Sequence, residues 1–328
     1  MDKILLAHGG GGSKSAELTR RVFQRFLRDP LLLEMDDAAR LPGQVFSTDS
    51  FVVKPLFFPG GDIGRLAVCG TINDLAVMGA EPLYLSIAFI IEEGFPVAQL
   101  EKILVSIAKA CRESGVRIVC ADTKVVERGK ADGIFITTAG IGRPLFKKPV
   151  LPARVRPGDA ILLNGPLGLH GVSVLTARGE FGLTGKIKSD VAPLWGLIKK
   201  CRHLDIPFMR DPTRGGLAQT LNELVYKKKF GARILEDKLP IPKKVAAVCD
   251  ILGFDPLHIA NEGKVVMVAA RRDADKALKI LRGQPLGKGT RLIGEITAEN
   301  PGRVTMATRA GSERIIMPPV GEILPRIC

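Results

Sequence analysis

The sequence predicts a mixed α/β protein, α+β in both halves, with two domains and a flexible C-terminal tail. Its 328 residues are 46% hydrophobic, enough for the cores of two domains. Strand-like alternation and helix-like periodicity follow one another in both halves of the chain. A stretch with four prolines between residues 143 and 159 separates the halves, and we place the domain boundary near residue 147.

The first domain, residues 1–147, contains three helical patterns. Leu18, Val22 and Phe26 have the spacing of one face of an amphipathic helix, with Ser15 as its N-cap. Asp62 and Gly79 are suited to cap the ends of a second helix, and residues 97–115 form the third. Strands are expected at residues 44–53, 83–91, 116–120 and 133–142, with Val45, Phe51 and Val53 on one face of the first.

The second domain, residues 148–310, again mixes both element types. Its expected strands are 160–163, 264–270 and 290–296, and its expected helices are 194–202, 215–229, 243–252 and 274–282. Residues 311–328 form the expected tail, because Pro318, Pro319 and Pro325 argue against a regular helix.

The apolar segments and the cysteines point to a soluble cytoplasmic protein without a membrane partner. No apolar run approaches the ~18 residues of a membrane span, and the apolar part of the N-terminal segment is too short for a signal peptide. The six cysteines form no C-x-x-C pair. We expect the first five to be small buried apolar residues, and Cys328, the last residue, to be exposed.

The net charge of +14 raises the question of nucleic-acid binding. The basic residues are scattered in pairs and triplets, and only one Trp and two Tyr are available for stacking on bases. This pattern argues against nucleic acid as the main partner and favours an anionic substrate or an acidic protein.

A glycine run lies between an apolar segment and a helix, in the stretch AHGGGGSKSAELTRR. A phosphate-binding P-loop aligned on Lys14 would need glycines where the chain has His8 and Ser13, so the motif is absent. The run Gly9 to Gly12 still allows close approach of the backbone to phosphate. A mobile loop without a ligand is the alternative reading.

Several aspartates are embedded in apolar segments, where a carboxylate is costly unless it is paired or bound to a metal. Their number, together with the glycine run, suggests sites that hold Mg²⁺ against nucleotide phosphates. These residues are Asp37, Asp49, Asp74, Asp122 and Asp211.

Two further stretches carry polar residues suited to chemistry. The segment DPTRGGL begins at Asp211 and has the composition of a helix N-terminus that can bind an anion. Glu262 precedes a buried strand and Lys124 follows another, so each is either a general base or an ordinary turn residue.

The segments DDAARL, STDSFVV, INDLAVMGAEP, ADTKVV and DPTRGGLA occur in this order and resemble the AIR synthase-like superfamily. With AHGGGG near the start and PRIC at the end, the sequence resembles the HypE family of hydrogenase maturation factors within it. The resemblance covers the whole chain. The two terminal motifs are specific to that family, and the internal motifs indicate the superfamily.

The resemblance implies two AIR synthase-like domains, a homodimer formed through the first domain, and ATP with Mg²⁺ as cofactors. The implied metal ligands are Asp37, Asp49, Asp74, Asp122 and Asp211. The implied nucleotide-binding residues are Gly9, Gly10, Gly11, Gly12, Thr48, Asn73, Asp122, Thr213 and Gly215. The implied catalytic residues are Cys328 and a base that is either Glu262 or Lys124.

The resemblance also implies a reaction. In this family a carbamoyltransferase, HypF, places a carbamoyl group on the terminal cysteine, here Cys328. ATP phosphorylates the carbamoyl oxygen, and loss of phosphate leaves a thiocyanate. The cyano group then passes to iron held by a HypC–HypD complex, for the nickel-iron hydrogenase centre.

Three other functions stay open. Selenophosphate synthetase requires a cysteine or selenocysteine near the glycine run, whereas the first cysteine here is Cys69. Thiamine-monophosphate kinase shares the internal motifs but gives no reason for PRIC. A non-catalytic nucleotide-binding scaffold, whose tail docks a partner, is the third.

Overall fold

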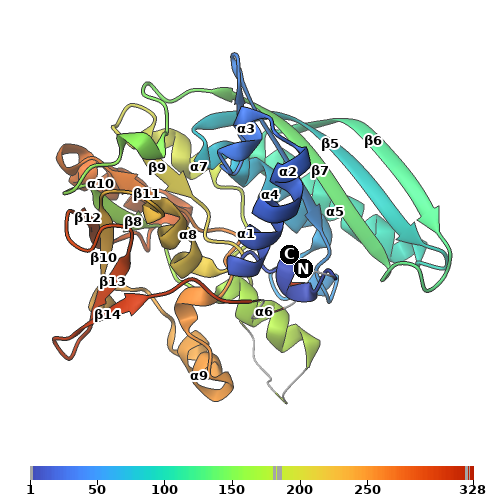
Figure 1. Cartoon of the computed structure of the whole chain (residues 1–328). Helices are drawn as coiled ribbons and strands as arrows, with labels where there is room; N and C mark the ends of the chain where they lie inside the picture. The colour runs from blue at the N-terminus through green and yellow to red at the C-terminus, as the bar shows by residue number, and fades with distance from the viewer. Residues whose placement is uncertain (1–2, 180–181, 183–186, 322–323, 325) are drawn as a thin grey trace.

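The computed structural model describes residues 3–179, 182, 187–321, 324 and 326–328. Two large β-sheets stand side by side, each with helices packed on it (Figure 1). The strand order is β1-β2-β7-β5-β6 in the first sheet and β14-β13-β10-β12-β8-β11-β9 in the second. The predicted mixed α/β class is confirmed.

The first sheet is antiparallel except where β5 pairs with β6. This parallel pair needs a crossover, which helix α5 supplies (Val97–Ser114), ending at Gly115 in the left-handed conformation at φ 76°. The strands are β1 (Ala39–Leu41), β2 (Gln44–Phe51), β5 (Ala80–Glu92), β6 (Arg117–Val126) and β7 (Ile134–Pro144).

Helix α4 (Ile63–Val77) lies between the two sheets, so nearly all its side chains are buried. The Asp62 carboxylate accepts hydrogen bonds from the backbone N–H groups of Gly64 and Arg65, which confirms the predicted cap. One side of α4 packs on the first sheet, whereas Ala76 and Val77 belong to a core formed with the second domain. The polar residues of this apolar helix therefore lie at the junction of the domains.

Helices cover both faces of the second sheet. On strand β8 (Ala160–Leu163), Ile161 and Leu163 face the core beneath α8, while Leu162 faces the core beneath α7 and α10. The helices are α7 (Trp195–Ile198), α8 (Gly216–Val225) and α10 (Ala274–Arg282). The remaining strands are β9 (Phe208–Arg210), β10 (Gly231–Leu235), β11 (Val266–Ala269), β12 (Arg291–Thr297), β13 (Val304–Ala307) and β14 (Glu313–Ile316).

The expected N-terminal amphipathic helix does not bury its apolar face. A π-helical turn (Thr19–Phe23) interrupts it, and the Val22 and Phe26 side chains are exposed. The helix begins at Ser13 with Gly12 as N-cap, not at Ser15. The smaller elements are α1 (Ser13–Leu18), α2 (Gln24–Phe26), α3 (Pro30–Leu33), β3 (Phe57–Phe58), β4 (Gly61–Asp62), α6 (Leu169–Arg178) and α9 (Lys243–Leu252).

The range expected to be the tail begins inside the second sheet, because β14 pairs with β13. Its last residues return to the first domain, where the backbone N–H of Val52 donates to a main-chain oxygen of Cys328. Cys328 is 9% exposed, so the expectation of an exposed thiol is wrong. Pro325 of the PRIC motif lies outside the described residues.

Two other cysteine predictions are also wrong. Cys120 is exposed because its strand register places it on the same uncovered face of the sheet as Thr48, and Cys111 is only partly buried. All six cysteines are among the described residues, and none forms a disulfide.

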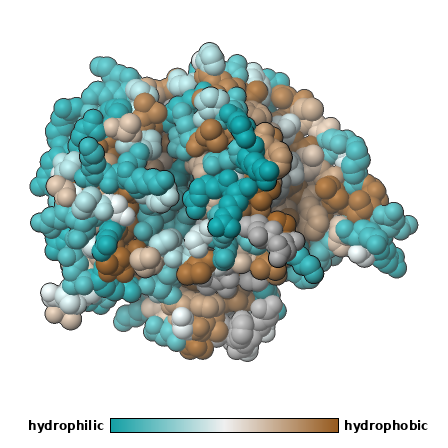
Figure 2. Space-filling model, in the orientation of Figure 1, coloured by the Kyte–Doolittle hydropathy of each residue, from teal (hydrophilic) through white to brown (hydrophobic). Residues whose placement is uncertain are grey.

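The molecular surface in Figure 2 is largely hydrophilic, with hydrophobic residues in smaller groups. None of the helices within the described ranges is long and apolar enough to cross a membrane.

Candidate active site

Four aspartates converge where the two domains meet. Asp49 is on β2, Asp74 on α4, and Asp37 precedes β1, while Asp211 follows β9 of the second sheet. Each of Asp37, Asp49 and Asp211 repels the carboxylate of Asp74, which requires that they lie close to it. The predicted convergence of these four carboxylates is therefore present in the folded chain.

Negative charge accumulates in this cluster. Burial and the neighbouring carboxylates raise the pKa of Asp74 well above its usual range. Burial and the charge of Asp37 raise the pKa of Asp211 to about 8. The pKa values of Asp37 and Asp49 are also raised, in both cases mainly by burial. A cation placed among these groups would relieve the repulsion.

The donor set fits Mg²⁺ bound together with a nucleotide. All the converging ligands are hard carboxylate oxygens, which suit this ion. Among the residues that the structure describes, no three acidic, histidine or cysteine side chains are close enough to hold an ion by themselves. Mg²⁺ at nucleotide sites takes only one or two carboxylates and fills its remaining positions with phosphate oxygens and water.

Strand parity separates Thr48 from the cluster. Ser47 and Asp49 point to the α4 side of the sheet, and the Ser47 hydroxyl donates to the Asp74 carboxylate at 2.8 Å. Thr48 lies between them and is exposed on the opposite face, where its hydroxyl donates to the Thr138 carbonyl. The sequence motif does not distinguish Ser47 from Thr48, because their hydroxyls differ only in the face of β2 on which they lie.

Asp122 and Lys124 also lie away from the cluster. They form an exposed ion pair at 2.7 Å within β6, because the strand continues past Cys120, where the sequence predicted its end. Asp122 aligns across β5 and β7 with Ser50, so it lies about 14 Å from β2, on the face opposite to Asp49. Within one chain it cannot share a metal ion with Asp49.

The glycine run packs against the DPTRGGL turn. The Arg214 guanidinium donates to the Gly9 carbonyl at 3.0 Å. A Cβ at Gly11, where φ is 76°, would lie 2.7 Å from the Cβ of Arg214. A Cβ at Gly12 would lie 2.5 Å from the carbonyl oxygen of Pro319. Glycine is therefore required for this contact.

The DPTRGGL turn itself is closed by backbone bonds. The N–H of Thr213 donates to the Asp211 carbonyl, and the N–H of Gly216 donates to the Thr213 carbonyl. Gly215 precedes α8 with φ 78°, a conformation that favours glycine. The turn thus places Asp211 in the acidic cluster and Arg214 on the glycine run.

Glu262 is buried and rigidly held. Its backbone N–H donates to Asp190 Oδ1 at 3.2 Å, and its carbonyl accepts from the Asn73 side-chain amide. Among the described residues, its Oε1 atom is buried without a hydrogen-bond partner. Burial, followed by the charges of Asp211 and Asp190, raises the pKa of Glu262 well above its usual range. This is the environment of a strong base or of a proton-carrying acid.

Asn73 serves this arrangement and is not open to a nucleotide. Its amide also donates to the Ala192 carbonyl and accepts from the Leu194 N–H, so it ties α4 to the loop from residue 187 to 194. The family resemblance implies nucleotide binding by Asn73, whereas the structure places its amide against the carbonyl oxygens of Glu262 and Ala192.

Arg210 was missed by the sequence analysis. It is almost buried and forms ion pairs with Asp36, Asp37 and Glu223, at 3.6, 3.0 and 2.6 Å. It precedes Asp211 and so fixes one end of the cluster. An arginine at the end of a short strand carries no local signal of such a role.

The Arg326–Cys328 segment docks on the stretch that follows β2. The backbone N–H groups of Val52 and Lys54 donate to main-chain oxygens of Cys328 and Arg326. Val52 lies only three residues beyond Asp49. A cavity of about 20 Å³ remains next to the segment, with walls that include Arg214, Gly215 and Ile327. That volume holds about one water molecule, so the segment largely fills the space.

The fold and this site define an AIR synthase-related protein. The N-terminal and C-terminal domain models of AIR synthase related protein match residues 35–143 and 156–307. A Rhodobacter capsulatus protein named carbamoyl dehydratase HypE is 46% identical over an alignment covering 100% of this chain and 98% of the relative. The chain therefore belongs to the HypE family.

Solved structures of this family are close to the present one. A HypE–HypF complex contains a chain with 48% identity and a TM-score of 0.89, and the match covers 92% of this chain and 99% of that one. A HypE structure in complex with ATP has 43% identity and a TM-score of 0.83, covering 99% and 100%.

Proposed function

We propose that the protein dehydrates a carbamoyl group on the thiol of Cys328 to a thiocyanate, at the expense of ATP, in the cytoplasm. The product supplies the cyanide ligand of nickel-iron hydrogenase. The observation that carries the proposal is the docking of the Arg326–Cys328 segment on Val52 and Lys54, three and five residues beyond Asp49 in the chain. Family membership and the relative solved with ATP support it.

The chemistry requires that the carbamoyl oxygen become a leaving group. The oxygen attacks the γ-phosphorus of ATP, ADP leaves, and the nitrogen gives up one proton. The carbon–oxygen bond then breaks, phosphate leaves with the electron pair, and the second proton departs from nitrogen as S–C≡N forms. Mg²⁺ held by the aspartates would neutralise the phosphate charge.

Glu262 is the base that this geometry favours. It is buried next to the cluster, with a raised pKa and an unbonded carboxylate oxygen. Lys124, the other candidate, is exposed on the open face of the first sheet and already paired with Asp122. The glycine run and Arg214 are suited to the phosphates.

The partners follow from the same chemistry. The relative solved with HypF supports a carbamoyltransferase of that kind as the donor. A HypC–HypD complex carrying iron is the proposed acceptor of the cyano group. Release of the Arg326–Cys328 segment from its site would let the thiol reach each of them.

We also infer a homodimer formed through the open face of the first sheet. Helices α4 and α5 cover one face, whereas Phe46, Tyr84 and Ile90 are 40–43% exposed on the other. This face also carries Asp122, which is too far from its own cluster to act there. Coexpressing Asp122→Asn with Cys328→Ser chains tests the pairing: restored turnover in the mixed dimer would support action between subunits, and its absence would contradict it.

Intact mass spectrometry tests the reaction. After incubation with the carbamoyltransferase, carbamoyl phosphate and Mg-ATP, we expect a gain of about 25 Da, CN replacing H, at Cys328. A stop at about 43 Da, the carbamoyl adduct, would show a carrier whose dehydration lies elsewhere. No adduct, with the transferase shown to be active, would contradict the assignment.

The Glu262→Gln variant tests the role of Glu262 as the base separately from the role of Cys328 as the carrier of the carbamoyl group. The variant should accumulate the carbamoyl adduct, with dehydration slowed by about 10²–10⁴-fold, because no group then accepts the nitrogen-bound proton. Glu299→Gln, at an exposed position of the second domain, is the matched control and should dehydrate normally.

A further inference from the structure

His170 is a completely buried histidine that the proposed reaction does not use. It lies in the first turn of α6, and both of its ring nitrogens have partners. Nδ1 is 2.8 Å from the Ser189 hydroxyl, and Nε2 is 2.8 Å from the carbonyl oxygen of Ile327. The second partner is the residue that precedes Cys328.

The two contacts determine the tautomer. A carbonyl oxygen only accepts hydrogen bonds, so Nε2 must carry the proton and donate it to Ile327. Nδ1 is then the acceptor, and the Ser189 hydroxyl donates to it. Burial lowers the pKa of His170, which favours the neutral ring that this arrangement requires. The ring edge also packs against Phe58, with centroids 5.4 Å apart.

The segment is held by bonds to its backbone and by its own side chains. The N–H groups of Val52 and Lys54 and the Arg178 guanidinium donate to main-chain oxygens on either side of Ile327. These bonds resemble the addition of a short strand to the edge of the first domain. The Arg326 side chain donates to the Val52 carbonyl and forms an ion pair with Asp132. The His170 side chain binds the carbonyl oxygen of Ile327, which immediately precedes Cys328.

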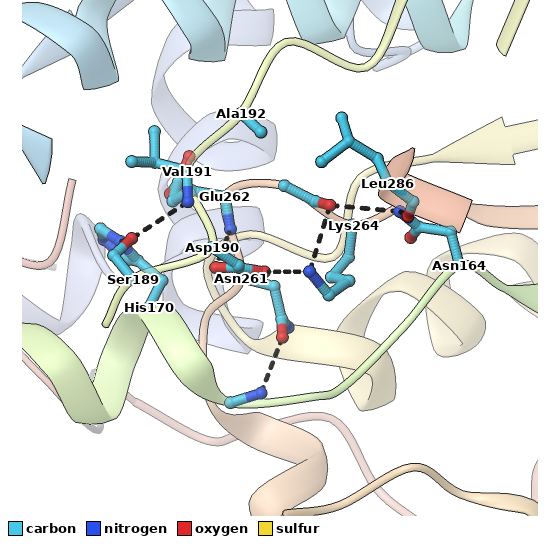
Figure 3. A network of polar contacts seen from close by, with 12 residues as sticks. Asn164, His170, Ser189, Asp190, Val191, Ala192, Asn261, Glu262, Lys264 and Leu286 are labelled. Carbon is cyan, nitrogen blue, oxygen red and sulfur yellow. Dashed lines mark hydrogen bonds and ion pairs between the residues drawn. The ribbon is translucent and has the colours of Figure 1, made fainter. Parts of the chain in front are cut away.

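Ser189 links this contact to the candidate base. Its hydroxyl accepts the N–H of Val191, and the next residue, Asp190, accepts the N–H of Glu262. Asp190 also pairs with the buried Lys264 at 2.8 Å. Figure 3 shows this order, with His170 and Ser189 on one side, Lys264 on the other, and Asp190 and Glu262 between them.

We propose that His170 is the positioning residue that holds the Arg326–Cys328 segment in the site, through its bond to the Ile327 carbonyl. This inference rests on the proposed function for its purpose, since the docked thiol is the one that carries the carbamoyl group. Through Ser189 and Asp190, the same short loop holds both the segment and Glu262.

Two substitutions distinguish docking from a purely structural role. The side-chain nitrogen of Asn occupies about the position of Nδ1, so His170→Asn keeps a partner for Ser189 but cannot reach Ile327. The nitrogen of Gln occupies about the position of Nε2, so His170→Gln keeps the donor to Ile327. The two variants replace the ring by a similar amide and differ in which contact they retain.

The readout is the alkylation rate of each cysteine in the full-length chain, measured by peptide mass spectrometry with iodoacetamide and without ATP. We expect Cys328 to react roughly 3- to 10-fold faster in His170→Asn than in the wild type, and close to the wild-type rate in His170→Gln. Exposed Cys120 and buried Cys69 are internal references whose rates should not change.

An unchanged Cys328 rate in His170→Asn, or an equal increase in both variants, would overturn the proposal. If Cys69 becomes reactive in His170→Asn, the variant has unfolded and Ser189→Ala carries the test. That change leaves His170 in place without its orienting hydroxyl, and we expect a rise of about 2-fold at Cys328 alone. No rise there would also overturn the proposal.

This assay contains neither nucleotide nor carbamoyl donor. A protein that docks Cys328 through His170 but never gains about 25 Da would therefore contradict the proposed function and leave the docking intact.

Discussion

At the scale of single residues, the site holds more negative charge than the folded chain can neutralise. Asp74 receives one hydrogen bond from Ser47, while Asp211, Asp37 and Asp49 all repel it. Functional sites often retain such unfavourable groups at the expense of stability.

Asp74→Asn should therefore stabilise the protein without ligand by about 0.5–2 kcal/mol, because it replaces a buried acid, whose ionisation is opposed by burial and by three neighbouring carboxylates, with a neutral amide that keeps an acceptor for Ser47. The same change should abolish the rise in melting temperature that Mg-ATP gives to the wild type. Thermal melts with and without Mg-ATP check both expectations. Asp250→Asn, at an exposed position of α9, should alter neither, and a destabilised Asp74→Asn protein would contradict the prediction.

Single residues also mark where sequence reasoning was limited. Asp49 was correctly placed on the face of Val45 and Val53, and four of the five aspartates do converge. Thr48 and Asp122 lie on the opposite face of the sheet. Patterns of apolar residues predict parity in a half-buried strand such as β2, but β6 is exposed on both faces and gives no such signal.

At the scale of elements, the sequence predicted what periodicity and caps encode. Helix α4 has its predicted cap at Asp62, and α5 ends at Gly115 as expected. The N-terminal helix was wrong in its burial, because its apolar spacing does not reveal whether another element covers it. The docking of the Arg326–Cys328 segment depends on contacts across more than 150 residues of sequence, which no local pattern contains.

The contact between the glycine run and residue 319 gives a prediction at this scale. Gly12→Ala should destabilise the protein by about 1–3 kcal/mol and weaken ATP binding, because the new methyl group would overlap the Pro319 carbonyl. Gly196→Ala is the matched control, since a Cβ at this exposed position would meet no other part of the described chain within 4 Å. Equal effects of the two changes, in chemical denaturation and nucleotide titration, would contradict this reading.

At the scale of the whole molecule, the proline-rich stretch between the domains is fastened to the second domain. Asp205, in the loop before β9, forms ion pairs with Lys148 and Arg154 of this stretch and with Arg272. The stretch predicted as the domain boundary is therefore held in place by ion pairs to the second domain. The AIR synthase-related architecture follows from the sequence, whereas this fastening depends on side chains far apart in the chain.

Asp205 should make stability depend on pH. Burial acts to raise its pKa, but the cations of Lys148, Arg154 and Arg272 outweigh it and hold the folded pKa below the usual value. The carboxylate therefore stabilises the fold above the unfolded pKa of about 4, and this contribution is lost as pH falls through the lower folded pKa.

Denaturation of the wild type and Asp205→Asn from pH 7 to pH 2.5 measures this contribution. The difference should be about 2 kcal/mol near neutrality and should shrink toward zero in acid. A stability difference that stays constant with pH would contradict the prediction, because the contribution of Asp205 would then not depend on its ionisation.

The backbone docking of the last residues has a thermodynamic consequence. The bonds from Val52, Lys54 and His170 are made to main-chain oxygens and not to the sulfur. These three bonds can therefore form whether the sulfur carries hydrogen, a carbamoyl group or a cyano group. Cys328 is only 9% exposed and the neighbouring cavity measures about 20 Å³, so a group added to the sulfur must displace its surroundings. Differences in docking free energy between the three forms therefore arise around the sulfur and not along the backbone.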